Sequence, residues 1–243
     1  MKLKDKVALV TGSAGKGMGR SIALTLAREG AKVAVNYRTS KNEAQDIVNH
    51  INSLSGESIA IEANVFESDG CRKLVNATIE HFGRIDICII NPGAGWHPEP
   101  IDKLDSSAAL EDVHNEVAPF FHFMPLVLPH MYKRKWGRVI GISLLPPYES
   151  PAYSYNVAKA ARTHSMLRAR DEAWRNGVTI NIISPGPAAA IESLNEAIEQ
   201  CDHGPAWQKR SNTSPQDIAE SVAFLCSDAG RFITGCVLPF LFH

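Results

Sequence analysis

Short β-branched runs alternate with helical patterns along nearly the whole chain, and this alternation limits the choice of fold more than any other feature. The run at 85–91 is almost continuously apolar, which is typical of a strand buried on both faces of a parallel sheet. Because crossovers between parallel strands are right-handed, the repeated strand–helix–strand units predict an α/β, Rossmann-like fold, a doubly wound parallel sheet of about seven strands with helices on both faces. The expected strands are 7–11, 32–36, 58–65, 85–91, 137–143, 178–184 and 236–240.

Helix-start signals separate these runs. Ser40 followed by Glu43 predicts a capping box, in which each side chain satisfies a backbone N–H of the other residue. Ser214, with Pro215 at the first helical position and Asp217 after it, predicts a second start. The segment 188–211 interrupts the alternation with only a weak helical pattern, and we expect it to form a lid over the substrate.

Composition and charge narrow the class of protein. With 243 residues, 44% of them hydrophobic, the chain is expected to form one domain over 1–243. Its formal charge of −1, with both signs interspersed, argues against a nucleic-acid partner. The five cysteines lack the paired spacings of a zinc site or a disulfide framework, so we expect no metal and a cytoplasmic location. The first apolar run is too short to span a membrane.

A glycine-rich loop follows the first expected strand and leads directly into an expected helix. Glycines let the backbone turn tightly and approach a pyrophosphate, whose charge is favoured at a helix N-terminus. The order of strand, loop and helix favours a dinucleotide-binding loop over a merely flexible one. The residues expected to contact the cofactor here are Gly12, Lys16, Gly17, Met18 and Gly19.

The end of the second expected strand indicates which dinucleotide binds. Asn36, Tyr37 and Arg38 stand there, without the acidic residue that would bond both ribose hydroxyls of NAD. Arg38 and Lys16 instead offer positive charge to a 2′-phosphate, so NADP(H) is favoured over NAD(H). The alternative is that both are solvated surface cations.

These motifs together resemble the main branch of the short-chain dehydrogenase/reductase family, including its 3-oxoacyl reductases and related ketone reductases, over almost the whole chain. The resemblance implies a small-molecule carbonyl or alcohol substrate and a homo-oligomer, either a dimer or a tetramer. It also implies further cofactor contacts. The residues that carry the resemblance outside the glycine loop are Asn91, Gly93, Asn115, Gly137, Arg138, Tyr155, Lys159, Asn181, Pro185, Gly186, Ile233, Thr234 and Gly235, and the implied additional cofactor contacts are Asn64, Val65, Asn91, Gly93, Tyr155, Lys159, Pro185 and Gly186.

Tyr155 and Lys159 are four residues apart, so on a helix they share one face. A free tyrosine has a pKa of about 10, and a nearby ammonium together with an oxidised nicotinamide would favour its phenolate. Tyr155 is therefore the expected proton donor. The resemblance implies that Lys159 also binds the nicotinamide ribose, that Asn115 holds a water joining Lys159 to solvent, and that a serine orients the substrate oxygen.

The sequence departs from the family at several of these positions. The glycine loop is one residue longer, and Ile90 and Pro92 replace an asparagine and an alanine. Counting from Gly137 puts the catalytic serine on Leu144; a loop shorter by one residue would restore Ser143, which we favour. The C-terminus after Pro239 also differs from the family pattern, which puts the usual tetramer contact in doubt.

Several bulky side chains are expected near the mouth of the site, which favours a partly apolar substrate; they are Trp96, Leu144, Tyr148 and Trp207. The alternative is that the two tryptophans merely anchor their loops. The leading interpretation is a ketone or 3-oxoacyl reductase; a sugar, steroid or other alcohol dehydrogenase of the same family, or a catalytically weak dinucleotide-binding scaffold, are the alternatives. An enoyl reductase is disfavoured because its tyrosine and lysine are six residues apart and Ala152 stands at that position here.

Overall fold

The computed structural model describes residues 1–240 apart from 94, 96–97, 145–150 and 207–211. Its described strands form one parallel sheet in the order β3-β2-β1-β4-β5-β6-β7, so the predicted doubly wound sheet is confirmed. The order reverses beside β1, where ligands of such sheets bind beyond the carboxyl ends of the strands. The strands are β1 (Val7–Val10), β2 (Lys32–Tyr37), β3 (Ser58–Glu62), β4 (Ile87–Ile90), β5 (Gly137–Ile142), β6 (Val178–Ser184) and β7 (Val237–Pro239).

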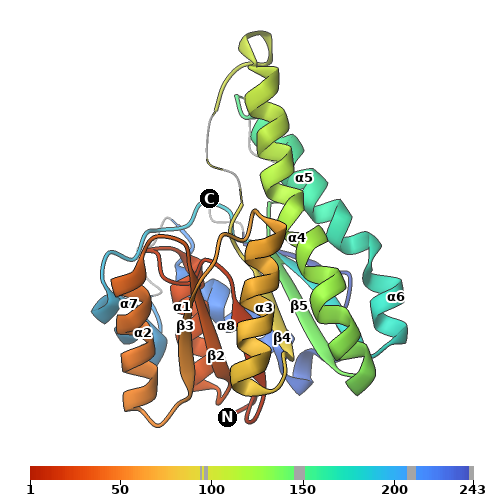
Figure 1. The fold of residues 1–243 in the computed structure, drawn as a ribbon. Coiled ribbons are helices and arrows are strands. Elements are labelled where there is room, and N and C mark those ends of the chain that lie inside the picture. The colour runs from red at the N-terminus through yellow and green to blue at the C-terminus, as the bar shows by residue number, and fades with distance from the viewer. Residues whose placement is uncertain (94, 96–97, 145–150, 207–211, 241–243) are drawn as a thin grey trace.

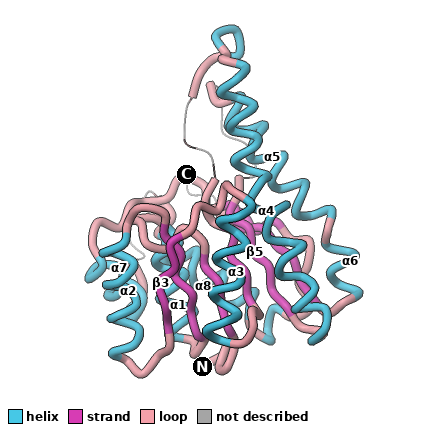
Figure 2. Tube along the Cα trace, in the orientation of Figure 1, coloured by secondary structure: helices cyan, strands magenta, loops and turns pink. Residues whose placement is uncertain are grey.

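Helices cover both faces of this sheet (Figures 1 and 2). One apolar cluster joins the sheet to α1, α2, α7 and α8, and a second joins it to α3, α4, α5 and α6. Ala8 and Val10 of β1 belong to the first cluster and Leu9 to the second, as alternating side chains of a doubly covered strand require. The helices are α1 (Met18–Arg28), α2 (Lys41–Ser53), α3 (Ser68–Phe82), α4 (Ser106–Arg134), α5 (Tyr153–Arg168), α6 (Arg170–Arg175), α7 (Leu194–His203) and α8 (Pro215–Cys226), with 3₁₀ turns η1 (Ile101–Lys103) and η2 (Asp228–Gly230).

Helix α4 is the longest, with 29 residues, and its first turns project beyond the sheet (Figure 1). Asp105 caps it by accepting hydrogen bonds from the amides of Ser107 and Ala108. Three prolines lie inside the helix. Pro119 has no N–H, so it cannot supply the helical hydrogen bond to the carbonyl of Asn115, and α4 is locally weakened beside the candidate site.

The two predicted helix starts differ in outcome. Ser214 and Asp217 form the expected capping box with Pro215 in the first turn. Ser40 does precede α2, but its side chain makes no capping hydrogen bond, so that capping box is wrong. Within the described residues, no helix is long and apolar enough to cross a membrane.

The segment predicted to be a lid contains a well-packed helix. Ser193 caps α7 through the amide of Glu196, and Ala197 and Cys201 are buried in the same cluster as α1. Residues 207–211 lie outside the described part of the chain. Movement of the segment over a substrate stays a prediction.

Candidate active site

The turn after β1 packs closely against the loop after β4 and is hydrogen-bonded to the end of β2. Gly12 has a φ of +57°, and a Cβ there would lie 2.5 Å from the ring of Pro92. Its amide donates to Oδ1 of Asn36 at 2.9 Å. The buried side-chain amide of Asn36 also donates to the carbonyls of Tyr37, Ile61 and Ala63, so this one residue ties the loop to the ends of β2 and β3.

The N-terminus of α1 is suited to an anion. Its N-cap is Gly17, which has no side chain to cap the helix, and no acidic residue lies in the first turn. The first backbone amides of α1 are therefore not capped by the side chain of the N-cap residue or by a first-turn carboxylate, and they suit an anion. Behind the loop lies Arg20, which is 5% exposed and whose Nε and Nη1 have no hydrogen-bond partner in the described structure. Burial lowers the pKa of Arg20, partly offset by Glu43. The loop therefore fits the phosphates of a dinucleotide.

A cavity of about 330 Å³ opens beside this loop. Arg38, at the end of β2, is exposed and lines it. The side chain of Asn64 also donates to Glu67 and accepts from the amide of Phe66. The predicted cofactor residues that the structure brings together around this cavity are Gly12, Arg38, Asn64, Val65, Asn91 and Gly93.

Lys16 lies in a different place from Arg38. Its ammonium pairs with Glu192 at 2.5 Å, and both side chains are exposed. It lines a neighbouring cavity of about 430 Å³, together with Arg20, Glu43 and Glu192. In this structure, Lys16 and Arg38 therefore do not line one common binding site for the 2′-phosphate, contrary to the prediction.

Tyr155 and Lys159 do lie on one face of α5, as predicted. The Lys159 ammonium is 5.2 Å from the centre of the Tyr155 ring. Tyr155 is half-buried and Lys159 is 8% exposed. This arrangement brings a cation to a phenol, which is the pair that the proposed acid–base chemistry needs.

Two further residues complete a buried charged cluster. Glu116 of α4 is fully buried, and its Oε1 lies 2.7 Å from Nζ of Lys159. Its Oε2 lies 3.0 Å from Nη1 of Arg162, which is also fully buried. Burial raises the pKa of Glu116, but the charges of Arg162 and Lys159 outweigh it and leave the pKa below its ordinary value. Burial lowers the pKa of Lys159, which Glu116 opposes.

The loop after β4 is shaped around this cluster. Arg162 donates to the carbonyls of Ile90 and Pro92. A Cβ on Gly93 would lie 2.2 Å from Oε1 of Glu116, so the glycine makes room for the carboxylate. Since Gly93 also lines the cavity beside Arg38, the cluster adjoins the expected cofactor site.

Sequence reasoning missed Glu116 and Arg162. Arg162 is three residues after Lys159 and seven after Tyr155, so helical spacing places it on their face, and this was the available signal. The structure brings Glu116 to Lys159, whereas Asn115 is half-buried on the adjoining side of α4. The predicted role of Asn115 in holding a water is not tested.

The structure does not support the predicted contact between Ser143 and the substrate. Ser143 is 3% exposed, and its hydroxyl donates to the carbonyl of Lys159 at 3.0 Å and accepts from Thr163 at 2.7 Å. The correction has a physical reason: the hydroxyl is used to join the end of β5 to α5. Leu144 is also buried, at 6% exposed.

The remaining predicted residues are only partly described. Pro185 is buried at the end of β6, and Gly186 has a φ of +63° with the carbonyl of Phe240 beside it. Trp96, Tyr148 and Trp207 lie outside the described residues. No group of three or more potential metal ligands occurs in the described part of the chain.

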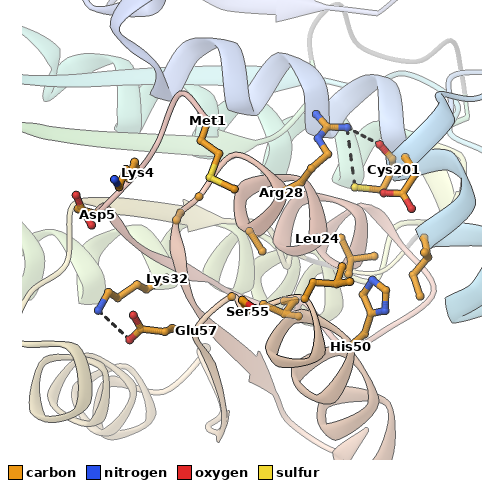
Figure 3. Close-up of a pocket in the computed structure, with 18 residues that line it drawn as sticks. Met1, Lys4, Asp5, Leu24, Arg28, Lys32, His50, Ser55, Glu57 and Cys201 are labelled. Atoms are coloured by element: carbon orange, nitrogen blue, oxygen red, sulfur yellow. Dashed lines mark hydrogen bonds and ion pairs between the residues drawn. The ribbon is translucent and has the colours of Figure 1, made fainter.

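A separate cavity of about 380 Å³ lies near the amino ends of the strands, and Figure 3 shows the side chains that line it. It is lined by Lys4 and Asp5 before β1, by Lys32 at the start of β2, and by Leu24 and Arg28 of α1. These residues lie near the amino ends of the strands, away from Tyr155. The cavity is therefore not part of the candidate active site.

Comparisons with known proteins find relatives over nearly the whole chain. A family model described as enoyl-(acyl carrier protein) reductase matches residues 12–240. The 3-oxoacyl-(acyl-carrier-protein) reductase FabG of Staphylococcus epidermidis is 32% identical over 241 residues, covering 95% of each chain. The 7alpha-hydroxysteroid dehydrogenase of Escherichia coli (strain K12) is 32% identical over 247 aligned positions, covering 98% of this chain and 93% of that protein.

Solved structures show the same fold. A 7α-hydroxysteroid dehydrogenase complexed with NADH and 7-oxo glycochenodeoxycholic acid superimposes with a TM-score of 0.85 at 28% identity, covering 98% of this chain and 94% of that one. A short-chain dehydrogenase from Burkholderia cenocepacia in complex with NADP gives a TM-score of 0.83 at 26% identity, covering 99% and 98%.

Proposed function

Since this chain belongs to the short-chain dehydrogenase/reductase family, we propose that it is an oxidoreductase that transfers a hydride between NADP(H) and the carbonyl or secondary-alcohol carbon of a small molecule. The observation that carries the proposal is the Tyr155–Lys159 pair. Glu116, which pairs with Lys159, packs against Gly93, and Gly93 and the glycine loop line the same cavity. The bound dinucleotide would supply or accept the hydride. The protein's own residues would bind the cofactor, orient the substrate and exchange a proton with the substrate oxygen.

Each part of the described site has a role in this proposal. The amides at the start of α1 bind the pyrophosphate, and Asn64 and Val65 flank the adenosine. Lys159 binds the nicotinamide ribose and favours the phenolate of Tyr155, which exchanges a proton with the substrate oxygen. Because Ser143 is committed to α5, Tyr155 polarises that oxygen without it.

The exposed Arg38 supports NADP(H) as the preferred cofactor, since no carboxylate follows Asn36 at the end of β2. The relatives themselves do not decide this point, because one solved neighbour holds NADH and the other NADP.

For the substrate we propose a partly apolar ketone or 3-oxoacyl compound, because one relative is a 3-oxoacyl reductase and another a hydroxysteroid dehydrogenase. The test is NADPH oxidation across 3-oxoacyl thioesters, oxosteroids, sugars, small ketones and enoyl thioesters. We expect turnover with a ketone class and none with enoyl thioesters. Tight NADPH binding by calorimetry without turnover on the whole panel would instead support the scaffold alternative.

We also propose a homo-oligomer that forms through α4 and α5. Both helices expose apolar side chains, with Leu110 70% and Phe121 62% exposed on α4 and Tyr153 48% exposed on α5.

A further inference from the structure

The carboxylate of Glu116 contacts the same ammonium that is expected to activate Tyr155. Oε1 of Glu116 lies 2.7 Å from Nζ of Lys159, and that Nζ lies 5.2 Å from the centre of the Tyr155 ring. Glu116 is fully buried, so water does not screen its charge as it would on the surface. A negative charge at this position acts on Tyr155 in the direction opposite to Lys159.

Residues of α5 and of the loop after β4 hold Glu116 in this position. Arg162 of α5 binds its second oxygen at 3.0 Å, and Gly93 after β4 leaves the space into which the carboxylate fits. Arg162 is itself fixed by the carbonyls of Ile90 and Pro92. Glu116 is therefore held at both oxygens and cannot turn away from Lys159 without leaving Arg162 unpaired.

The charged groups around Tyr155 can be named for each packed element. In the described residues, α5 contributes Lys159 and Arg162, and α4 contributes Glu116. Asp112, one turn earlier on α4, is also buried, at 8% exposed. From the described part of the loop after β4, the carbonyls of Ile90 and Pro92 and the glycine at Gly93 contact the cluster. The ammonium of Lys159 thus lies close to both the carboxylate of Glu116 and the ring of Tyr155.

We propose that Glu116 is a positioning residue of this site, which fixes the ammonium of Lys159 and partly cancels its charge, so that Tyr155 stays protonated in neutral solution. Tyr155 then acts as the proton donor in carbonyl reduction near neutral pH and becomes a base for alcohol oxidation only in alkaline solution. The inference rests on the proposed function for its consequence in catalysis. The effect of Glu116 on the pKa of Tyr155 can be measured in the protein without cofactor or substrate.

The direct test is a titration of tyrosinate absorbance without cofactor. The chain has five tyrosines, and the difference between the wild type and Tyr155→Phe isolates Tyr155. The same difference measured in a Glu116→Gln background should show the Tyr155 pKa lower by about one unit, because a buried negative charge has been removed. Glu111→Gln, an exposed position on α4, is the matched control and should leave the value unchanged. Equal Tyr155 pKa values with and without the Glu116 charge would overturn the proposal.

A second variant covers the risk that Glu116→Gln does not fold, since it leaves Arg162 and Lys159 without their counter-charge. Glu116→Asp keeps that charge against Arg162 but is one methylene too short to hold both cations as Glu116 does. We expect a downward shift of the Tyr155 pKa of about half a unit. An unchanged value in a folded Glu116→Asp protein would reduce Glu116 to a structural counter-ion of Arg162.

Activity gives a separate readout. On the best alcohol substrate, the limb of the kcat/KM profile that rises with pH reports deprotonation of Tyr155, and it should move to lower pH in the Glu116 variants by the same amount as the absorbance titration. An active enzyme whose profile does not move contradicts the inference alone. A wild-type protein without turnover on any substrate contradicts the proposed function, while the absorbance titration still decides the role of Glu116.

Discussion

At the scale of single residues, the residues of the site differ in whether their charged groups already form ion pairs within the protein. The carboxylate of Glu116 binds both Lys159 and Arg162, whereas Arg38 is exposed at the mouth of the cavity. Residues of the first kind set the charge of the site, and those of the second kind are available to a ligand. Arg38, and Tyr155 as the proposed proton donor, are the positions at which single substitutions test the proposed function.

Replacing Tyr155 by Phe should slow turnover on the order of 10²–10⁴-fold with NADPH affinity nearly intact, because the change removes the proton donor and little packing. Steady-state kinetics and a direct NADPH titration check this. Tyr153→Phe, at an exposed position two residues earlier, is the control. Turnover retained in Tyr155→Phe would exclude the assignment.

Replacing Arg38 by Asp should weaken NADPH binding much more than NADH binding. The lost charge-assisted contact with a 2′-phosphate should cost about 1.5–3 kcal/mol, and the new carboxylate repels that phosphate. Calorimetric titration of both cofactors measures the difference, with Arg72→Asp on the exposed face of α3 as a control. Equal losses for NADPH and NADH would show that Arg38 is only a surface cation.

At the scale of secondary-structure elements, α5 is the part that assembles the site. It carries Tyr155, Lys159 and Arg162 on one face, and it is tied to α4 through Glu116 and to β5 through Ser143. The hydroxyl of Ser143 bonds both the Lys159 carbonyl and Thr163. Its role is therefore to hold the helix, which separates it from the predicted role of orienting substrate.

Ser143→Ala should lower the free energy of unfolding by about 1–2 kcal/mol, because it leaves the buried Thr163 hydroxyl without its acceptor. We expect kcat to change far less than 10²-fold. Ser165→Ala is a matched control on α5, since the Ser165 hydroxyl bonds only the Arg162 carbonyl of its own helix in the described structure. Unfolding in urea and steady-state kinetics distinguish the two roles. A drop in kcat on the order of 10²-fold without loss of stability would restore the catalytic interpretation.

At the scale of the whole molecule, α4 and α5 form one packed pair that exposes several apolar side chains. Leu110 and Phe121 are eleven residues apart, about three helical turns, so they share one face of α4. Tyr153 and Val157, four residues apart on α5, are also exposed. An exposed apolar surface of this kind favours association between subunits.

We therefore expect a dimer or larger assembly in light scattering after size exclusion, and we expect Phe121→Glu to shift it toward the monomer. The introduced charge would have to be buried in the subunit interface without a partner. Leu54→Glu, at an equally exposed position at the end of α2, should leave the assembly unchanged. A wild-type monomer, or a Phe121→Glu protein of unchanged mass, would rule out this interface.

The sequence by itself determined the sheet, the glycine loop and the Tyr155–Lys159 pair, because strand patterns, glycine positions and a four-residue helical spacing are local. Only the tertiary structure decided that Glu116 reaches Lys159, that Ser143 bonds α5, and that Lys16 pairs with Glu192. Each of these contacts joins elements far apart in the chain. Which side chain meets which then depends on helix rotation and loop length, and a shift of one residue turns a helical side chain by about 100°.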